Sequence, residues 1–237
     1  MQIRDASALV TGAGRGIGRA IALALAREGA RLTVVSRTAH ELDSLVGEIE
    51  TVGARGIAFA GDLRSASTCD AAVAAAVECF GGLQILVNNA GVGAFSNVAD
   101  TSDEDWETIL ATNLTAVFRL TRAALPHLSR NGGHVLMVSS LAGRNPIAGM
   151  GAYCASKAAL DQLAACLMLE VRHQGVKVTT VAPGSVDTAF GGNSRGADSS
   201  WMLTPEDVAQ TVLELLRMRD GAHSSRVEMR PARPQKR

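Results

Sequence analysis

Short apolar segments alternate with helical patterns along nearly the whole chain, and this alternation constrains the fold more than any other feature. The strand-like segments are residues 6–12, 31–37, 55–62, 83–91, 133–140, 176–184 and 225–231. The helical patterns are residues 16–30, 39–53, 67–81, 102–129, 149–169 and 204–219. The strand segments do not alternate apolar with polar residues, so both of their faces are predicted to be buried, as in a parallel sheet. The sequence therefore predicts an α/β fold: a doubly wound parallel sheet of about seven strands with helices on both faces.

The 237 residues are predicted to form one domain, because no linker or shift in composition divides them. The 23 basic residues balance the 23 acidic ones, which disfavours nucleic acid or a membrane surface as a partner. No apolar run is long enough to cross a membrane, and the first residues do not resemble a signal peptide. The four cysteines, at positions 69, 79, 154 and 166, lack metal-ligand spacing. We expect no metal site and a reduced, cytoplasmic protein with its thiols in the core.

A glycine-rich loop, "TGAGRGIG", lies between the first strand and the first helix. Gly12, Gly16 and Gly18 are the spaced glycines, and Gly14 is additional. Such a loop turns tightly, lets the backbone approach a pyrophosphate and points a helix N-terminus at negative charge. A merely tight turn is the alternative, but the strand before the loop and the helix after it favour dinucleotide binding and a Rossmann-type sheet.

Two polar residues, Tyr153 and Lys157, begin an otherwise apolar helix. Residues four apart share one helix face, so both side chains are expected to point into the same space. A tyrosine at the edge of the core beside a lysine that extends to solvent is the alternative. Ser139 and Ser140 end the preceding strand, and ligands of open α/β sheets bind beyond the carboxyl ends of strands. Because adjacent strand residues face opposite ways, only one of these serines can serve the site.

These residue types fit proton transfer to an oxygen atom. A free phenol has a pKa of ~10, too high for a general acid/base at neutral pH. A nearby ammonium group and an oxidised nicotinamide are expected to lower the pKa of Tyr153. Tyr153 would then give a proton to a carbonyl oxygen or take one from an alcohol, while Ser140 hydrogen-bonds the same oxygen.

The end of the second strand bears on the choice of nicotinamide cofactor. NAD-binding sites usually carry an acid there, but Ser36 and Arg37 occupy the place and no carboxylate precedes Glu41. Arg15, in the glycine loop, can approach the same ribose. Two guanidinium groups suit a 2′-phosphate, so NADP(H) is the predicted cofactor. Two ordinary surface arginines are the alternative.

The spacing T-G-x-x-x-G-x-G resembles the classical, single-domain short-chain dehydrogenase/reductase family. The resemblance continues through "GDL" at 61–63, "NNAG" at 88–91, "TNL" at 112–114, the serines at 139–140, "YCASK" at 153–157 and "PGSVDT" at 183–188. It implies an oxidoreductase with the catalytic residues Asn113, Ser140, Tyr153 and Lys157. The cofactor contacts that it implies, taken with the arginine argument, are Gly12, Arg15, Gly16, Ile17, Gly18, Ser36, Arg37, Asp62, Leu63, Asn89, Ala90, Gly91, Tyr153, Lys157, Pro183, Gly184, Val186 and Thr188.

The resemblance also assigns individual roles. Asp62 would contact the adenine ring, and Asn113 would anchor a water that passes protons to Lys157. Lys157 would hold the nicotinamide ribose, and Thr188 would hydrogen-bond the carboxamide. The family separation favours Ser140 over Ser139.

The substrate is less constrained. Residues 188–200 resemble the family's substrate lid, and Phe95, Leu141, Met150 and Phe190 are candidate walls for a small carbonyl or alcohol. The 3-oxoacyl-[acyl-carrier-protein] reductases are similar, but the tail "SRVEMRPARP" and the helix end "VRHQG" depart from their pattern. Hydroxy-acid and sugar-alcohol dehydrogenases stay equally open.

Assembly and the class of function complete the expectations. The resemblance implies a homodimer or homotetramer built through the two long central helices. A nucleotide-sensing or regulatory protein on the same fold is the alternative function. Such a protein is expected to lack a catalytic residue, whereas Asn113, Ser140, Tyr153 and Lys157 are all present. Epimerases of the extended type need additional chain for a second substrate domain, and this chain has none.

Overall fold

A seven-stranded parallel sheet is the centre of the computed structural model, which describes residues 1–130, 132–190 and 199–233. The strand order in this part of the chain is β3-β2-β1-β4-β5-β6-β7, and every neighbouring pair is parallel. The strands are β1 (Ser7–Thr11), β2 (Arg31–Ser36), β3 (Arg55–Ala60), β4 (Ile85–Asn88), β5 (His134–Val138), β6 (Lys177–Pro183) and β7 (Arg226–Met229). The doubly wound sheet predicted from the sequence is confirmed.

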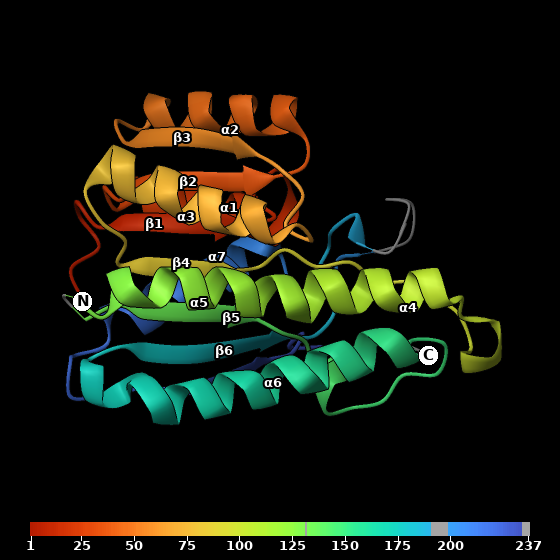
Figure 1. The fold of residues 1–237 in the computed structure, drawn as a ribbon. Coiled ribbons are helices and arrows are strands. Elements are labelled where there is room, and N and C mark those ends of the chain that lie inside the picture. Colours follow the sequence, from red (N-terminus) through yellow and green to blue (C-terminus); the bar gives the residue numbers. More distant parts are fainter. Residues whose placement is uncertain (131, 191–198, 234–237) are drawn as a thin grey trace.

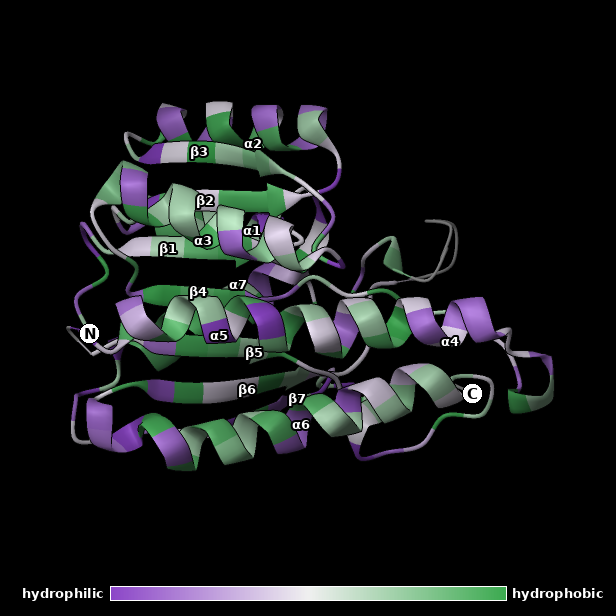
Figure 2. Cartoon of the chain, viewed as in Figure 1, coloured by the Kyte–Doolittle hydropathy of each residue, from purple (hydrophilic) through white to green (hydrophobic). Residues whose placement is uncertain are grey.

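Helices cover both faces of the sheet (Figure 1). One face packs against α1 (Gly16–Arg27), α2 (Ala39–Thr51) and α7 (Pro205–Arg217). The other packs against α3 (Ala66–Phe80), α5 (Ala116–Leu128) and α6 (Gly151–Val171). Strands β1, β4 and β5 are buried at every position, so the apolar segments are enclosed on both sides. Figure 2 shows the apolar colour along these central strands.

The predicted helix at 102–129 has an irregular middle. It consists of α4 (Asp103–Leu110), a π-helical turn (Ala111–Thr115) and α5. A π turn accommodates one extra residue without ending the helix, so the apolar pattern continues through it and does not reveal it. Asn113 lies in this turn, fully buried.

Three short 3₁₀ turns complete the described elements: η1 (Val98–Asp100), η3 (Leu141–Gly143) and η4 (Arg172–Gln174). The expectation of core thiols is wrong for two cysteines, because Cys79 and Cys166 lie on the outer faces of α3 and α6. Within the described residues, no helix has the length and apolarity that a membrane crossing requires. Of the predicted lid at 188–200, residues 191–198 lie outside the described residues.

Candidate active site

One large cleft lies at the carboxyl ends of the strands. Its volume is about 970 Å³, at the upper end of the range for small-molecule sites. The strand order reverses between β1 and β4, and the residues that follow both strands line the cleft. This is the place where open α/β sheets bind their ligands.

The glycine loop forms one wall of this cleft, and its geometry requires glycine. Gly12 and Gly16 have positive φ angles of 62° and 56°. A Cβ atom on Gly18 would lie 2.3 Å from the carbonyl oxygen of Gly12, so no side chain fits there. The loop leads directly into the N-terminus of α1, whose first backbone N–H groups have no partner inside the helix. The backbone therefore fits the pyrophosphate of a dinucleotide.

Thr11 and Asn89 fix the loop to the end of β4. The Thr11 hydroxyl accepts hydrogen bonds from the backbone N–H groups of Asn89 and Ala90 at 2.9 and 3.0 Å. The Asn89 amide donates to the Thr11 and Gly12 carbonyls at 2.9 and 3.2 Å. Asn89 thus holds the loop from behind, and Thr11 is a site residue that the sequence analysis missed. The threonine that opens the glycine motif was the available signal.

Arg15, Ser36 and Arg37 line the end of the cleft that adjoins β2. Both arginines are exposed, and the Ser36 hydroxyl contacts the backbone of Thr38. Asp62 and Leu63 line the same end, with Leu63 buried. The Arg64 guanidinium binds the Asp62 carboxylate at 2.6 Å, and this hydrogen bonding lowers the pKa of Asp62.

A carboxylate that the sequence analysis left aside lies at this end of the cleft. Glu41 Oε2 is 2.3 Å from the position that a Cβ atom on Gly14 would take, and Ser36 Oγ is 3.2 Å from it. Glu41 comes too late after β2 for the usual acid position, but the first turn of α2 carries it back to the loop. This end of the cleft therefore carries the cationic side chains of Arg15 and Arg37 and two carboxylates, Glu41 and the Arg64-paired Asp62.

Tyr153 and Ser140 meet on the other side of the cleft. Tyr153 is 8% exposed, and both residues line the cleft. Burial raises the pKa of Tyr153, and hydrogen bonding with Ser140 offsets part of the rise. The direction is opposite to the lowering predicted from the sequence. Ser139 is buried, and its hydroxyl donates to the Lys157 carbonyl at 3.5 Å.

Lys157 is buried below Tyr153. Its ammonium donates to the Val138 carbonyl at 2.9 Å and lies 5.8 Å from the centroid of the Tyr153 ring. Burial lowers the pKa of Lys157 to about 8, while the carboxylate of Asp161 acts in the opposite direction. The ammonium is also close to Gly91, where an added Cβ atom would lie 3.6 Å from Nζ.

Asn113 contacts the site by way of the loop that follows β4. Its Oδ1 accepts from the Val92 N–H at 2.8 Å, and its Nδ2 donates to the Val92 carbonyl at 2.9 Å and to Ser156 Oγ at 3.0 Å. The side chain thus fastens the segment after Gly91 to α6. Its polar atoms are occupied by these contacts, and Ser156 is a second residue that the sequence analysis missed.

The segment after β6 closes the cleft. Thr188 Cγ2 lies 3.3 Å from the position of a Cβ atom on Gly16, so this segment contacts the glycine loop. Phe190 packs on Tyr153, with 5.4 Å between ring centroids. The remaining predicted contact residues also line the cleft: Ile17, Ala90, Gly91, Pro183, Gly184 and Val186, and the predicted walls Phe95, Leu141 and Met150.

Fold and site together define a dinucleotide-binding α/β protein with a tyrosine, a lysine and a serine at its cleft. Comparison with known proteins gives the family: the model of the short chain dehydrogenases matches residues 6–198. The chain belongs to the short-chain dehydrogenase/reductase family of oxidoreductases.

Two curated relatives show how the similarity is distributed. The chain is 34% identical over 234 residues to the glycine betaine reductase ATRR of Emericella nidulans, covering 94% of this chain but only 18% of that protein. It is 37% identical over 187 residues to the 2,5-dichloro-2,5-cyclohexadiene-1,4-diol dehydrogenase LinX of Sphingobium indicum, covering 78% of this chain and 75% of the relative.

Solved structures of the family superpose over nearly the whole chain. An alcohol dehydrogenase from Thermococcus sibiricus, complexed with 5-hydroxy-NADP, has a TM-score of 0.91 at 31% identity and covers 97% of this chain and 98% of its own. A metagenomic short-chain oxidoreductase in complex with NADP has a TM-score of 0.87 at 33% identity, with coverage of 99% and 100%.

Proposed function

We propose that this oxidoreductase transfers a hydride between NADP(H) and a small carbonyl compound or secondary alcohol, with Tyr153 as the general acid/base. The observation that carries the proposal is the meeting of Tyr153, Ser140 and Lys157 at a cleft whose opposite wall is a glycine loop. A regulatory protein that only senses nucleotides would have no use for this proton-transfer group.

The chain's own residues divide the work of carbonyl reduction. Ser140 and Tyr153 hydrogen-bond the carbonyl oxygen and orient it. The carbonyl carbon gains a hydride, the oxygen takes the phenolic proton of Tyr153, and an alcohol forms with a net gain of two electrons. Developing negative charge on the oxygen and then on the phenol is stabilised by the Lys157 ammonium. When bound, the nicotinamide supplies the hydride in this direction and accepts it in the reverse one.

The raised pKa of Tyr153 fits a proton donor at rest. A buried phenol keeps its proton at neutral pH, so it is ready for reduction. Alcohol oxidation needs the phenolate, which requires positive charge close to the ring. Lys157 is the protein's source of that charge, 5.8 Å from the ring centroid.

The adenosine end supports NADP(H) over NAD(H). Arg15 and Arg37 line the cleft without an anchoring acid at the end of β2, and guanidinium groups bind phosphate well. Two solved relatives hold NADP-type ligands. Glu41 acts against a 2′-phosphate, so the preference is set by the balance of these charges.

The substrate side of the cleft is mainly apolar. Phe95, Leu141, Met150 and Phe190 line it, which suits a moderately apolar carbonyl or alcohol. The similarity to a ring-diol dehydrogenase is in keeping with such a substrate. We further propose a homodimer or homotetramer, and the free cysteines support a reducing compartment such as the cytoplasm.

A screen at the nicotinamide absorbance tests the proposed function. Carbonyl compounds would be offered with NADPH and with NADH, and alcohols with the oxidised forms, beside a Tyr153→Phe control. Turnover of several apolar carbonyls by the wild type but not by the control supports the proposal. Tight NADP(H) binding with no turnover across the panel would favour a nucleotide-sensing protein instead.

A further inference from the structure

A largely buried ion pair, Asp161 with Arg226, lies just outside the groups described so far. Arg226 Nη1 donates to Asp161 Oδ2 at 2.5 Å, and the side chains are 17% and 8% exposed for Arg226 and Asp161. The pair connects α6 with β7, the edge strand of the sheet. A buried ion pair is costly to desolvate and contributes little net stability. Stability alone therefore does not explain this pair.

Asp161 follows Lys157 by one helical turn, so the two side chains share a face of α6. The 3₁₀ turn after Ser140 covers both residues. A Cβ atom on Gly143 would lie 3.0 Å from Asp161 Oδ2 and 3.1 Å from the Lys157 carbonyl oxygen. The Asp161 side chain is only 8% exposed, so its charge acts on Lys157 with little screening by solvent.

Arg226 reaches Asp161 from strand β7, whereas Lys157 lies on the same helix as Asp161. The Arg226 Nε approaches Glu228 Oε1 at 3.4 Å, which continues an alternation of charges along β7. The same strand reaches the cleft, because the Gly184 N–H donates to the Met229 carbonyl at 2.9 Å and Pro231 lines the site. This arginine comes from the C-terminal segment that departs from the pattern of the carrier-protein reductases.

We propose that Asp161 and Arg226 are a positioning pair, which sets the electrostatic field at Lys157 and ties strand β7 to helix α6 behind the cleft. The inference rests on the proposed function, because that function makes Lys157 a catalytic residue. Asp161 favours the ammonium form of Lys157, and Arg226 moderates this effect. Removing Asp161 takes away the negative charge near Lys157, whereas removing Arg226 leaves that charge without its ion-pair partner, so the two substitutions must act on Lys157 in opposite directions.

The other groups that face Lys157 leave this field to the pair. Tyr153 faces it from α6 and is uncharged at neutral pH. The Val138 carbonyl faces it from β5, Gly91 from the loop after β4, and the neutral amide of Asn113 from the π turn. Among the described residues, Asp161 is the one carboxylate that acts on the pKa of Lys157.

The first test follows stability against pH in the free protein, without any substrate. The pKa of Lys157 is about 8 in the folded protein, below the ordinary value of about 10.4. The unfolded chain therefore holds more protons between these values, and the free energy of unfolding rises with pH across this window. Asp161→Asn should move the start of the rise down by about one pH unit, and Arg226→Met should move it up by less, because Arg226 acts on Lys157 only through Asp161. Lys157→Met identifies the part of the rise that belongs to this group.

The second test follows carbonyl reduction in the holoenzyme. The rate should fall as Lys157 loses its proton, so the alkaline limb moves down in Asp161→Asn and up in Arg226→Met. Arg217→Met is the matched control, because its partner Glu28, at 2.8 Å, belongs to an exposed pair between α7 and α1. It should shift neither profile.

The outcomes separate the inference from the proposed function. Two variants that move the profiles in the same direction, or not at all, overturn the positioning role and leave a structural pair only. If a single variant fails to fold, the double variant Asp161→Asn/Arg226→Met decides, since its window should start below that of the wild type. An unchanged start overturns the inference. If the variants shift the pH window of stability as expected but the wild type shows no turnover, the proposed function is contradicted and the electrostatic inference stands.

Discussion

At the scale of single residues, Lys157 has two proposed tasks that one substitution can separate. Lys157→Met removes the ammonium beside Tyr153 and the proposed ribose contact. We expect weaker NADP(H) binding and, for alcohol oxidation, a rate that rises only at higher pH. The reason is that burial keeps the phenol protonated once the nearby positive charge is lost. Fluorescence titration with cofactor and a pH–rate profile measure the two effects. Normal binding together with an unchanged profile would count against both tasks.

Cofactor choice also belongs to single residues. One charge-assisted hydrogen bond contributes about 1.5–3 kcal/mol, which corresponds to roughly ten- to hundredfold discrimination at ~1.4 kcal/mol per decade. Wild type should prefer NADPH by this factor, and Ser36→Asp with Arg37→Ala should reverse the preference. Glu41→Gln should strengthen the NADPH preference, since it removes the carboxylate beside Gly14.

The measurement is kcat/KM for both cofactors at low salt, because exposed charges are screened by salt. If the wild type has equal kcat/KM values for NADH and NADPH, Arg15 and Arg37 are ordinary surface residues. An unchanged preference in Glu41→Gln would show that the Glu41 carboxylate does not affect the choice of cofactor.

At the scale of elements, the loop between β1 and α1 depends on Thr11. Thr11→Val leaves the backbone N–H groups of Asn89 and Ala90 without their acceptor, and both lie at the base of the cleft. Leaving a buried donor unpaired costs about 1–3 kcal/mol, so urea unfolding should show a loss of this size together with weaker cofactor binding. Thr51→Val is the control, because its exposed hydroxyl bonds only within α2. If Thr11→Val and Thr51→Val have equal effects on stability and cofactor binding, the Thr11 hydroxyl does not fix the loop in place.

The elements themselves were largely predictable, because strand and helix patterns alternate without ambiguity. Both faces of β1, β4 and β5 are buried as the uninterrupted apolar runs indicate. The π turn at Asn113 was not predictable, since an extra residue in one turn leaves the apolar pattern nearly intact. The place of Glu41 was also hidden, because it depends on how the first turn of α2 meets the glycine loop rather than on spacing along the chain.

Some properties of the predicted site residues follow from the sequence, and others depend on the folded structure. Tyr153 and Lys157 share a helix face by simple periodicity, so their closeness follows from the sequence. The pKa of Tyr153 does not, because it depends on burial by residues such as Phe190 from a distant segment. The contact of Arg226 with Asp161 spans 65 positions and likewise needs the folded chain.

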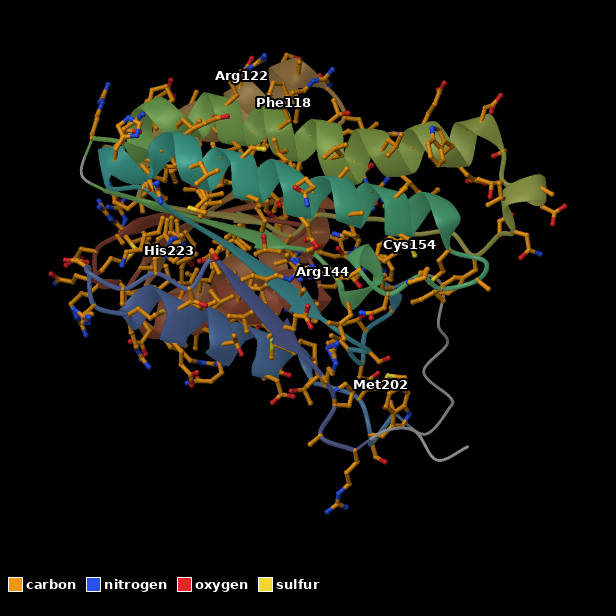
Figure 3. All side chains as sticks on the ribbon, turned by 90° about the horizontal axis from the view of Figure 1, so that it is seen from below. Phe118, Arg122, Arg144, Cys154, Met202 and His223 are labelled. Carbon is orange, nitrogen blue, oxygen red and sulfur yellow. The ribbon has the colours of Figure 1, made fainter. Side chains whose placement is uncertain are left out.

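At the scale of the whole molecule, apolar side chains remain uncovered on the outer faces of α5 and α6. Phe118 is 45% exposed and Leu169 is 58% exposed, and Figure 3 shows Phe118 and Arg122 on the outer side of α5. We expect a homodimer or homotetramer in solution, which light scattering after gel filtration would detect. Phe118→Glu with Leu169→Glu should lower the assembly state, whereas Val52→Glu, on α2's exposed end, should not. A monomeric wild type would contradict this expectation.

The central claim is that Tyr153 transfers the proton in an NADP(H)-dependent reaction. Single-turnover reduction of an apolar carbonyl by the NADPH-loaded protein, wild type against Tyr153→Phe, tests it most directly. The buried ring is retained in phenylalanine, so cofactor affinity should stay nearly the same. Loss of the general acid should slow hydride transfer by roughly 10²- to 10⁴-fold. If Tyr153→Phe reduces the carbonyl as fast as the wild type, Tyr153 is not the proton donor and the account of this site is wrong.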